Sequence, residues 1–150
     1  MRIYLPATLD ELDASELPPR RGHAVTAALR AALPDEDDEG LEFAAQLMAA
    51  DDSLDLIRAS QAAPRLRLVV SVDVPDDRVA TVDDAEDGAP SLVEVDGPLA
   101  VADVACVHVD EPGAAADVEA ALAGDDDAGE RLDDADLLWY DATELAAIPR

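Results

Sequence analysis

Hydrophobic and polar positions alternate most regularly in the segment RLRLVVSVDV, residues 65–74. Every second position there holds an aliphatic side chain: Leu66, Leu68, Val70, Val72 and Val74. Side chains of a strand point alternately to the two faces of a sheet, so this segment is predicted to be a strand with one buried face. Shorter runs of the same kind predict further strands over residues 1–6, 79–82, 91–95, 103–109 and 137–140.

Helical spacing replaces alternation in three segments, residues 23–33, 39–60 and 112–124. The second segment is predicted to bury one stripe of side chains: Phe43, Leu47, Ala50, Leu54 and Ile57. The run DDS at 51–53 can divide this segment into two helices, with Ser53 as a fresh N-cap.

Capping signals support these helices. TLDE matches a capping box, in which Thr8 and Glu11 satisfy each other's backbone amides before a short helical turn. The acidic run DEDDE at 35–39 directly precedes the longest helix, where carboxylates favour the positive end of the helix dipole. We therefore interpret that run as a helix start and not as a metal-binding cluster. Thr143 is the expected cap of a last helical turn over 141–148.

The order of these elements is strand, helices, strand, one or two strands, helix and strand. This order is typical of a ferredoxin-like βαββαβ sandwich of the α+β class, with both helical regions on one face of a single sheet. An alternative is another sheet of α and β elements that gains extra strands from residues 76–95. The chain has 150 residues, the usual size of one domain, so we expect a single domain over 1–150.

Charge distinguishes this sequence more than its hydrophobic pattern does. It has 36 acidic against 10 basic residues, a formal net charge of −26, and it contains arginine but no lysine. A strongly negative field repels nucleic acids and anionic membranes, so we expect neither as a direct partner. Three explanations of the acidity stay open: a salt-adapted surface, a contact surface for a basic protein, and mimicry of nucleic-acid charge. A GC-rich genome explains arginine in place of lysine, but not the excess of acid.

The same charge predicts a salt dependence. Screening weakens the repulsion between like charges, so the free energy of unfolding is expected to increase as ionic strength rises from low values. Melting temperatures in about 10 mM and about 200 mM sodium chloride, where the Debye length falls from ~30 Å to less than ~10 Å, measure this effect. A melting temperature that stays constant over this range would contradict the expectation.

The sequence also indicates a compartment. Cys106 is the only cysteine, so no internal disulfide can form. The N-terminal segment MRIYLPATLDEL lacks the apolar core of a signal peptide, and no run approaches the ~18 apolar residues of a membrane span. These observations favour a cytoplasmic protein.

Cys106 and His108 stand two positions apart in the predicted strand 103–109, which places both side chains on one face. Such neighbours lie roughly 6.5–7 Å apart, whereas a nucleophile and its base need a hydrogen bond of about 3 Å. We therefore interpret the pair as part of a packed sheet with a small buried cysteine and predict no catalytic residue. His108 is a candidate binding residue if its face of the sheet is open to solvent.

The loop DDAEDGAPSLVE at 83–94 partly matches a calcium-binding EF-hand loop, with Asp83, Asp87 and Glu94 at ligand positions. Its third position holds Ala85, which offers no side-chain oxygen, and no long helices flank it. We therefore predict no metal site. The sequence has no glycine-rich phosphate loop and no GxSxG, CxxC or HExxH motif, so we predict no cofactor.

Basic side chains are scarce, so their clustering is informative. Arg20, Arg21 and His23 gather at the start of the first predicted helix, and helix N-termini bind anions. A second basic pair, Arg65 and Arg67, shares one strand face. The simplest interpretation is that these arginines pair with nearby carboxylates. The alternative is an anion-binding groove, whose candidate residues are Arg20, Arg21, His23, Arg67 and His108, with Tyr4 as a further member.

Both ends of the chain carry a recurring pattern, MRIYLPATLDEL at the start and LLWYDATEL near the end, with VHVDE between them. With these motifs the chain resembles an uncharacterised family, a domain of unknown function, of small acidic actinobacterial proteins. The resemblance spans nearly the whole chain. It implies a bacterial cytoplasmic protein, intact from end to end, and supplies no catalytic residues.

The leading hypothesis for function is a non-enzymatic α+β domain that acts through protein contact, with self-association through a sheet edge as the simplest form. One alternative is a binding protein or enzyme that takes an anionic metabolite at the basic cluster. Another is an acidic mimic that occupies the nucleic-acid site of a basic protein.

Overall fold

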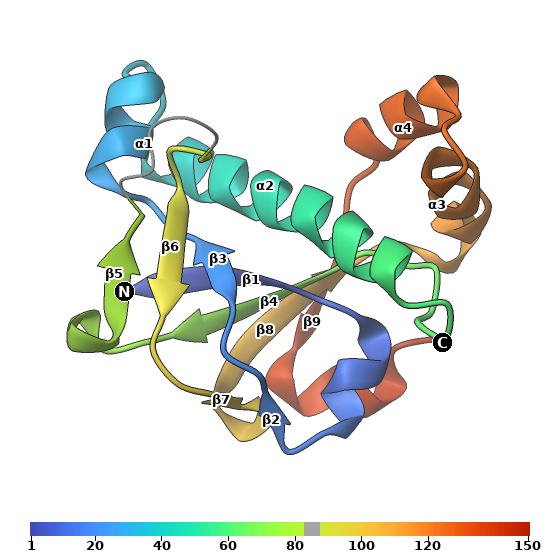
Figure 1. Cartoon of the computed structure of the whole chain (residues 1–150), viewed down its shortest axis with the longest axis horizontal. Coiled ribbons are helices and arrows are strands. Elements are labelled where there is room, and N and C mark those ends of the chain that lie inside the picture. Colours follow the sequence, from blue (N-terminus) through green and yellow to red (C-terminus); the bar gives the residue numbers. More distant parts are fainter. Residues whose placement is uncertain (83–87) are drawn as a thin grey trace.

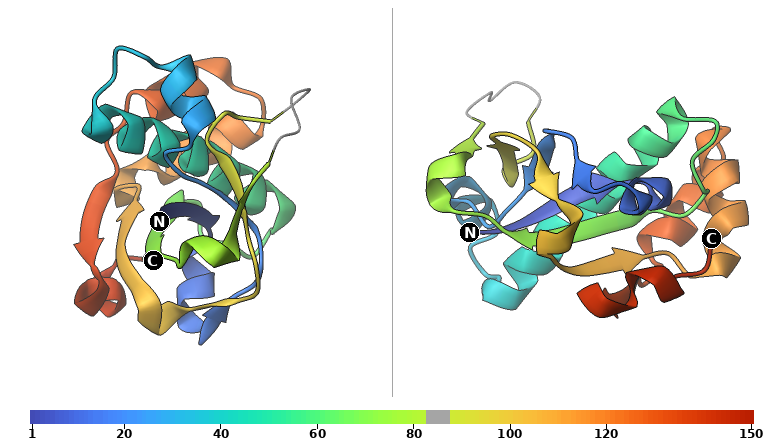
Figure 2. Two further views of the ribbon diagram at one scale, coloured as in Figure 1. Left: turned by 90° about the vertical axis from the view of Figure 1, so that its left-hand side faces the viewer. Right: turned by 90° about the horizontal axis from the view of Figure 1, so that it is seen from below.

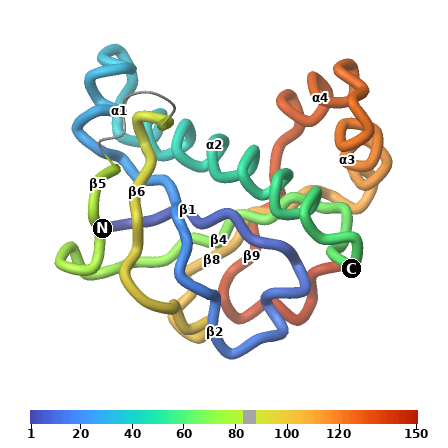
Figure 3. The backbone as a smooth tube through the Cα atoms, in the orientation of Figure 1, coloured from blue at the N-terminus to red at the C-terminus, as the bar shows by residue number. Residues whose placement is uncertain are grey.

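The computed structural model describes residues 1–82 and 88–150. Within this part, a seven-strand antiparallel sheet has the order β5-β6-β3-β1-β4-β8-β9 (Figure 1). Its strands are β1 (Arg2–Ala7), β3 (Arg21–His23), β4 (Leu68–Asp73), β5 (Val79–Thr81), β6 (Leu92–Val95), β8 (Val104–Val109) and β9 (Leu138–Asp141). A small second sheet pairs β2 (Glu16–Leu17) with β7 (Leu99–Ala100). Figure 3 follows the chain from β1 through β2 to β3.

Helices lie on both sides of the sheet, but they differ in kind. The α-helices are α1 (Ala27–Ala32), α2 (Asp38–Ala59), α3 (Ala115–Leu122) and α4 (Asp126–Asp133). The 3-10 helices are η1 (Leu9–Asp13), η2 (Asp76–Arg78), η3 (Val101–Asp103), η4 (Pro112–Ala114) and η5 (Ala142–Ala147). The α-helices lie above the sheet in the left view of Figure 2, whereas η1 and η5 lie below it.

The aliphatic face predicted for residues 65–74 is confirmed, and it forms the larger core. It faces away from α2 and is covered by the 3-10 helices η1 and η5 with the chain end that follows. The buried residues of this layer include Ile3, Leu5, Leu9, Leu68, Val70, Val72, Val107 and Ile148. The opposite face of the sheet packs on α2, where Tyr4 and Val69 contact small helix residues such as Ala45 and Ala49. Alanine there lets α2 approach the sheet closely.

The α+β class is confirmed, whereas the ferredoxin-like topology is not. A split βαβ unit leaves one strand between the two that its helix joins. Here α3 and α4 join β8 to β9, and these two strands pair directly with each other, His108 opposite Trp139. Both α-helical regions do lie on one side of the sheet (Figure 2), and there α3 and α4 pack on the C-terminal end of α2 through Ile57, Val118 and Leu132.

The segment before α1 is a strand and not a helix start. Residues Arg21–His23 form β3, which pairs with β6 so that Arg21 lies opposite Glu94. The helix begins only at Ala27, with Thr26 as its cap. Gly22 allows β3 to cross β1, because a Cβ there would lie 2.8 Å from Leu5 Cδ2 and 3.0 Å from the Tyr4 carbonyl oxygen. Pairing with a distant segment therefore overrides the local helical spacing.

Helix α2 is continuous through residues 51–53, so the predicted division at Ser53 is wrong. The Ser53 hydroxyl donates to the Ala7 carbonyl oxygen at 2.7 Å and accepts from the Leu68 amide at 3.0 Å. Ala7 and Leu68 form the last pair of the β1–β4 ladder, so this serine joins helix and sheet. The predicted inward position of Phe43 is also wrong, since its side chain is 54% exposed.

The capping signals are confirmed with one change. Glu11 Oε2 accepts from the Thr8 amide at 2.9 Å, and Asp37, within the acidic run, caps α2. The cap of η5 is Asp141, whose carboxylate accepts from the Thr143 amide at 2.9 Å. The Asp141 side chain reaches this amide from two positions earlier, so Thr143 is the donor and not the cap.

Two further expectations concern metals and membranes. The EF-hand comparison depends on residues 83–87, which lie outside the described residues. Residues 1–82 and 88–150 contain no group of three or more histidine, cysteine, aspartate or glutamate side chains placed to hold a metal ion. Among these same residues, no helix combines the length and apolar character needed to cross a bilayer.

Candidate functional site

A cavity of about 270 Å³ lies between the sheet and the N-terminal half of α2, and we call it the sheet–helix pocket. Helix α2 contributes four of its side chains at helical spacing, Glu39, Glu42, Phe43 and Gln46. The sheet contributes Arg2, Tyr4, Ser71, Cys106, His108 and Trp139. Most of these sheet residues come from the three adjacent strands β1, β4 and β8, and Trp139 comes from the edge strand β9.

Strand register explains why these sheet residues share one face. Ser71 lies opposite Tyr4 on one side and opposite Cys106 on the other. His108 lies two residues further along β8, opposite Trp139. Because side chains alternate along each strand, two adjacent rows of the sheet point into the same space under α2. The long strands therefore bury aliphatic residues on the face away from α2 and present polar and aromatic residues on the face toward α2.

Two buried polar atoms in this pocket have no hydrogen-bond partner. They are Ser71 Oγ and His108 Nδ1, and no other buried side-chain nitrogen or oxygen in residues 1–82 and 88–150 shares this property. Ser71 is fully buried. Most buried polar groups in proteins are hydrogen-bonded, and an unpaired one costs about 1–3 kcal/mol. Two unpaired groups that line one cavity indicate a place where a further molecule can bind.

The electrostatics of the pocket follow from burial and from fixed ion pairs. Burial lowers the pKa of His108, so its imidazole is neutral at neutral pH. Burial, together with the neighbouring Glu42 carboxylate, raises the pKa of Tyr4 to about 12, so Tyr4 keeps its proton. Asp73 holds the Arg2 guanidinium by two hydrogen bonds of 2.8 Å, from Nε and from Nη2.

Cys106 and His108 both line the sheet–helix pocket, yet they lack the arrangement of a nucleophile and its base. They are neighbours on one strand face, where two strand rises separate side chains by roughly 6.5–7 Å. A general base also needs a group that orients it, and His108 Nδ1 has no partner in the described structure. The pair therefore lines the pocket without the geometry of a catalytic dyad.

The basic cluster predicted at residues 20–23 is divided among different contacts. The Arg20 guanidinium donates to the Pro6 carbonyl oxygen at 2.7 Å and to Glu11 Oε2 at 3.0 Å. Arg21 is exposed on β3, so its side chain points into solvent. Arg20 therefore clamps the loop between β1 and β3, and it does not share a groove with Arg21.

Glu11 gives a pH-dependent prediction. Burial opposes ionisation of its carboxyl group, but hydrogen bonds from Arg20 and from Thr8 outweigh burial and lower its pKa. A lowered folded-state pKa stabilises the fold above the ordinary glutamate pKa, and this contribution disappears as pH falls through the folded value. The variant Glu11→Gln should therefore be less stable than the wild type at pH 7 and should approach it as pH falls below about 4. Urea unfolding at both pH values measures the difference, and a constant difference would contradict it.

His23 belongs to a buried hydrogen-bond network. Its Nδ1 lies 2.7 Å from Ser91 Oγ, and its Nε2 lies 3.0 Å from Asp52 Oδ2. The three residue types match a hydrolase triad, but Ser91 is fully buried, with Met48 Sδ 2.8 Å from its hydroxyl. No substrate reaches that hydroxyl, so the network joins β3, α2 and β6 structurally.

Arg67 forms the most deeply buried ion pair among the described residues. It lies just before β4, and the side chains of Arg67 and Asp110 are 4% and 1% exposed. Nη2 of Arg67 donates to Asp110 Oδ1 and to the Leu132 carbonyl oxygen, each at 2.9 Å. A cavity of about 200 Å³ beside it is lined by Leu47, Asp51, Arg67 and Asp133. Since Asp110 already holds the guanidinium, this cavity offers acidic groups and no free cation.

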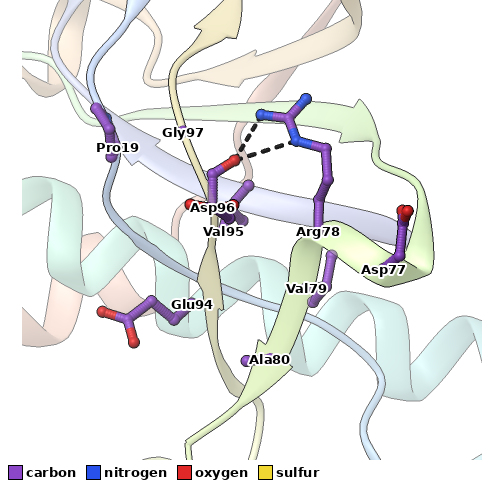
Figure 4. Close-up of a pocket in the computed structure, with 9 residues that line it drawn as sticks. All are labelled: Pro19, Asp77, Arg78, Val79, Ala80, Glu94, Val95, Asp96 and Gly97. Carbon is purple, nitrogen blue, oxygen red and sulfur yellow. Dashed lines mark hydrogen bonds between the residues drawn. The ribbon is translucent and has the colours of Figure 1, made fainter.

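The hollow with the largest volume among those described, about 500 Å³, lies near η2, β5 and β6 and differs from the sheet–helix pocket (Figure 4). Its one cationic side chain, Arg78, donates from Nε and Nη2 to the Asp96 carbonyl oxygen. Figure 4 shows the carboxylates of Asp77 and Glu94 directed away from that guanidinium. Arg78 thus holds the turn at Gly97, whose φ is +76°, and it is not free to bind an anion.

Sequence patterns identified His108 and Tyr4 as candidate residues but missed the rest of the pocket. Ser71 alternates with the aliphatic positions of residues 65–74 and so falls on the other face of that strand, which is the one signal that could have marked it. His23 and Arg67 are held by hydrogen bonds and ion pairs to Ser91, Asp52 and Asp110. These partners come from distant segments, and no local pattern marks them.

The fold and the pocket define an α+β protein with a small mixed cavity between sheet and helix. Residues 1–148 match a family of unknown function (DUF6912), so the chain belongs to that family. The resemblance inferred from the two chain ends is thereby confirmed at the level of an uncharacterised family. No curated protein and no solved structure matches the chain.

Proposed function

We propose that this protein is a non-enzymatic binding protein that takes a small organic molecule in the sheet–helix pocket. The observation that carries the proposal is that two buried polar atoms without a hydrogen-bond partner, Ser71 Oγ and His108 Nδ1, belong to residues that line the same cavity. A ligand with a hydrogen-bonding group satisfies both of them. The Phe43 and Trp139 rings at the same cavity supply apolar contact for the remainder of the ligand.

The size of the pocket limits the ligand. Its volume of about 270 Å³ lies just below the range of ~300–1,000 Å³ typical of ligand pockets. That space equals the liquid volume of about nine water molecules, which matches a single ring with a short polar chain. Larger cofactors such as dinucleotides exceed it.

Ligand binding can be followed through Trp139, the only tryptophan of the chain. A screen of single-ring amines, alcohols and acids should find compounds that change its fluorescence. The variant Ser71→Ala should weaken binding of such a compound about tenfold, because a lost hydrogen bond to a buried ligand costs about 1.4 kcal/mol. Removal of an unpaired hydroxyl should leave the free protein as stable as the wild type, or more stable.

The matched control is Ser15→Ala, which removes an exposed hydroxyl and should leave binding unchanged. A Ser71→Ala variant that binds every hit as well as the wild type would contradict the proposal. Water alone then suffices to satisfy both unpartnered atoms.

A second candidate function is self-association through β9. This strand is last in the sheet order, so one of its edges is unpaired, and Leu138 and Trp139 on it are 40% and 57% exposed. An antiparallel edge can pair with the same edge of a second copy. Light scattering after size-exclusion chromatography tests this, with a dimer expected for the wild type and a monomer for Trp139→Lys. A monomeric wild type at about 100 µM, well above the micromolar Kd of weak specific complexes, would exclude it.

A further inference from the structure

We infer that the molecule bound in the sheet–helix pocket is an organic cation, a ring or short chain that carries an ammonium group. This inference rests on the proposed function and adds the chemical class of the ligand. It derives from the charges that line the cavity, from the groups that neutralise some of them, and from two exposed aromatic rings that line it.

Two carboxylates of α2 line the pocket without a fixed cation. Glu39 and Glu42 are separated by one helical turn, and neither forms an ion pair with any residue in 1–82 or 88–150. Glu39 lies in the first turn of α2, where the helix dipole partly compensates its charge. Glu42 lies beyond that turn, next to Tyr4, and it therefore supplies the stronger attraction for a cation.

The basic side chains at the pocket do not offset these carboxylates. The Arg2 guanidinium is held by both oxygens of Asp73, so this pair adds little net charge. His108 is neutral, because its burial disfavours the imidazolium form. An anionic ligand would meet two uncompensated carboxylates, whereas an ammonium group gains from both.

The aromatic side chains at the pocket suit the same ligand class. Phe43 from α2 and Trp139 from β9 both line the cavity, and their side chains are 54% and 57% exposed. A cation held over the face of a tryptophan or phenylalanine ring is attracted by the ring quadrupole. Exposure of two large rings at one cavity is otherwise unfavourable, and a bound ligand covers both.

Ser71 and His108 supply the unpartnered hydrogen-bonding atoms of the site. The Ser71 hydroxyl can donate or accept, and the neutral His108 ring offers Nδ1 as an acceptor or a donor according to its tautomer. An ammonium group carries three donors and no acceptor. The acceptors in this pocket therefore match its hydrogen-bonding pattern.

A matched series of probes tests the charge of the ligand. Benzylamine, benzyl alcohol and benzoate carry the same ring with a positive, neutral and negative group. At about 150 mM salt, where the Debye length of ~8 Å screens the general negative field of the protein, Trp139 fluorescence should report binding of benzylamine. Benzylamine should bind at least about tenfold more tightly than benzyl alcohol, and benzoate should not bind.

Two variants distinguish the effect of the pocket carboxylate on binding from the effect of the protein's overall negative charge. Glu42→Gln should reduce the preference for benzylamine over benzyl alcohol about fivefold or more, since the loss of one nearby charge at an effective dielectric constant of ~20 is worth at least about 1 kcal/mol. The control Asp126→Asn/Glu130→Gln removes two charges on α4, at the opposite end of α2 (Figure 1), and should keep the preference. An equal loss in both variants would show general attraction to a negative surface and would overturn the inference.

The outcomes also separate this inference from the proposed function. Tighter binding of benzoate or benzyl alcohol that Ser71→Ala weakens would overturn the cationic class while it supports the pocket. Failure of all three probes at about 20 mM, a concentration at which fragments of ~8 non-hydrogen atoms normally bind, would overturn the cationic class directly. The proposed function itself fails only if Ser71→Ala leaves every binding compound unaffected.

Discussion

Replacement of Arg67 by alanine is expected to lower the free energy of unfolding by about 3–5 kcal/mol, the typical cost of breaking a buried ion pair from one side. The Asp110 side chain, only 1% exposed, then lies in the interior without a cation. The Leu132 carbonyl oxygen also loses the hydrogen bond that it accepts from Arg67. Asp110 retains only the Arg67 backbone amide, which donates to Oδ2 at 2.7 Å. A stability of 5–15 kcal/mol is typical of a domain, so about a third or more of it can be lost. Urea unfolding followed by circular dichroism measures the change.

Two further variants define what Arg67→Ala reports. Arg131→Ala removes an arginine from an exposed pair with Asp117 and should leave the unfolding midpoint nearly unchanged. The double variant Arg67→Met/Asp110→Asn should recover part of the lost stability, because it leaves no unpaired charge in the interior. An Arg67→Ala variant as stable as Arg131→Ala would show that water reaches Asp110.

The second large effect is expected for Ser53→Ala, with a loss of about 2–4 kcal/mol. This change removes one hydroxyl that serves two buried backbone groups, the Ala7 carbonyl oxygen and the Leu68 amide. Each orphaned group costs about 1–3 kcal/mol when water cannot replace its partner. Alanine is also the better helix former, so any loss of stability originates at the contact with the sheet and not in α2 itself.

The measurement for Ser53→Ala is again urea unfolding, with Ser15→Ala as the exposed serine control. A loss below about 1 kcal/mol would contradict the prediction, because a water molecule then occupies the position of the hydroxyl and bridges the two strands. Hydrogen exchange of the Leu68 amide distinguishes these cases, since an amide without a protected partner exchanges faster.

The elements that sequence patterns predict well are those set by local physics. Alternation from Leu66 to Val74 identified the strand with its buried face, because the period of side chains along a strand needs no partner to be recognised. The capping box at Thr8 and Glu11 is likewise a contact between residues three positions apart. Asp37, within the acidic run, caps a helix for the same reason.

The elements that sequence patterns predict poorly depend on distant segments. His23 was assigned to a helix, but β6 supplies hydrogen bonds that make β3 the better solution there. Phe43 was assigned to the core because spacing cannot show how far the sheet extends under α2. Likewise, the sheet–helix pocket needs the register that places Ser71 between Tyr4 and Cys106. That register joins segments of three separate strands, and no single segment carries its signature.

The central position of β1 has a consequence for synthesis of the chain. Strand β1 leaves the ribosome well before β4, with which it forms its longest ladder and which ends at Asp73. At typical elongation rates of 5–20 residues per second, the apolar segment Ile3–Leu5 waits roughly 3–13 s for that partner. A nascent chain that stops before β4 should therefore need a chaperone, and translational pauses upstream of residue 68 should increase its aggregation.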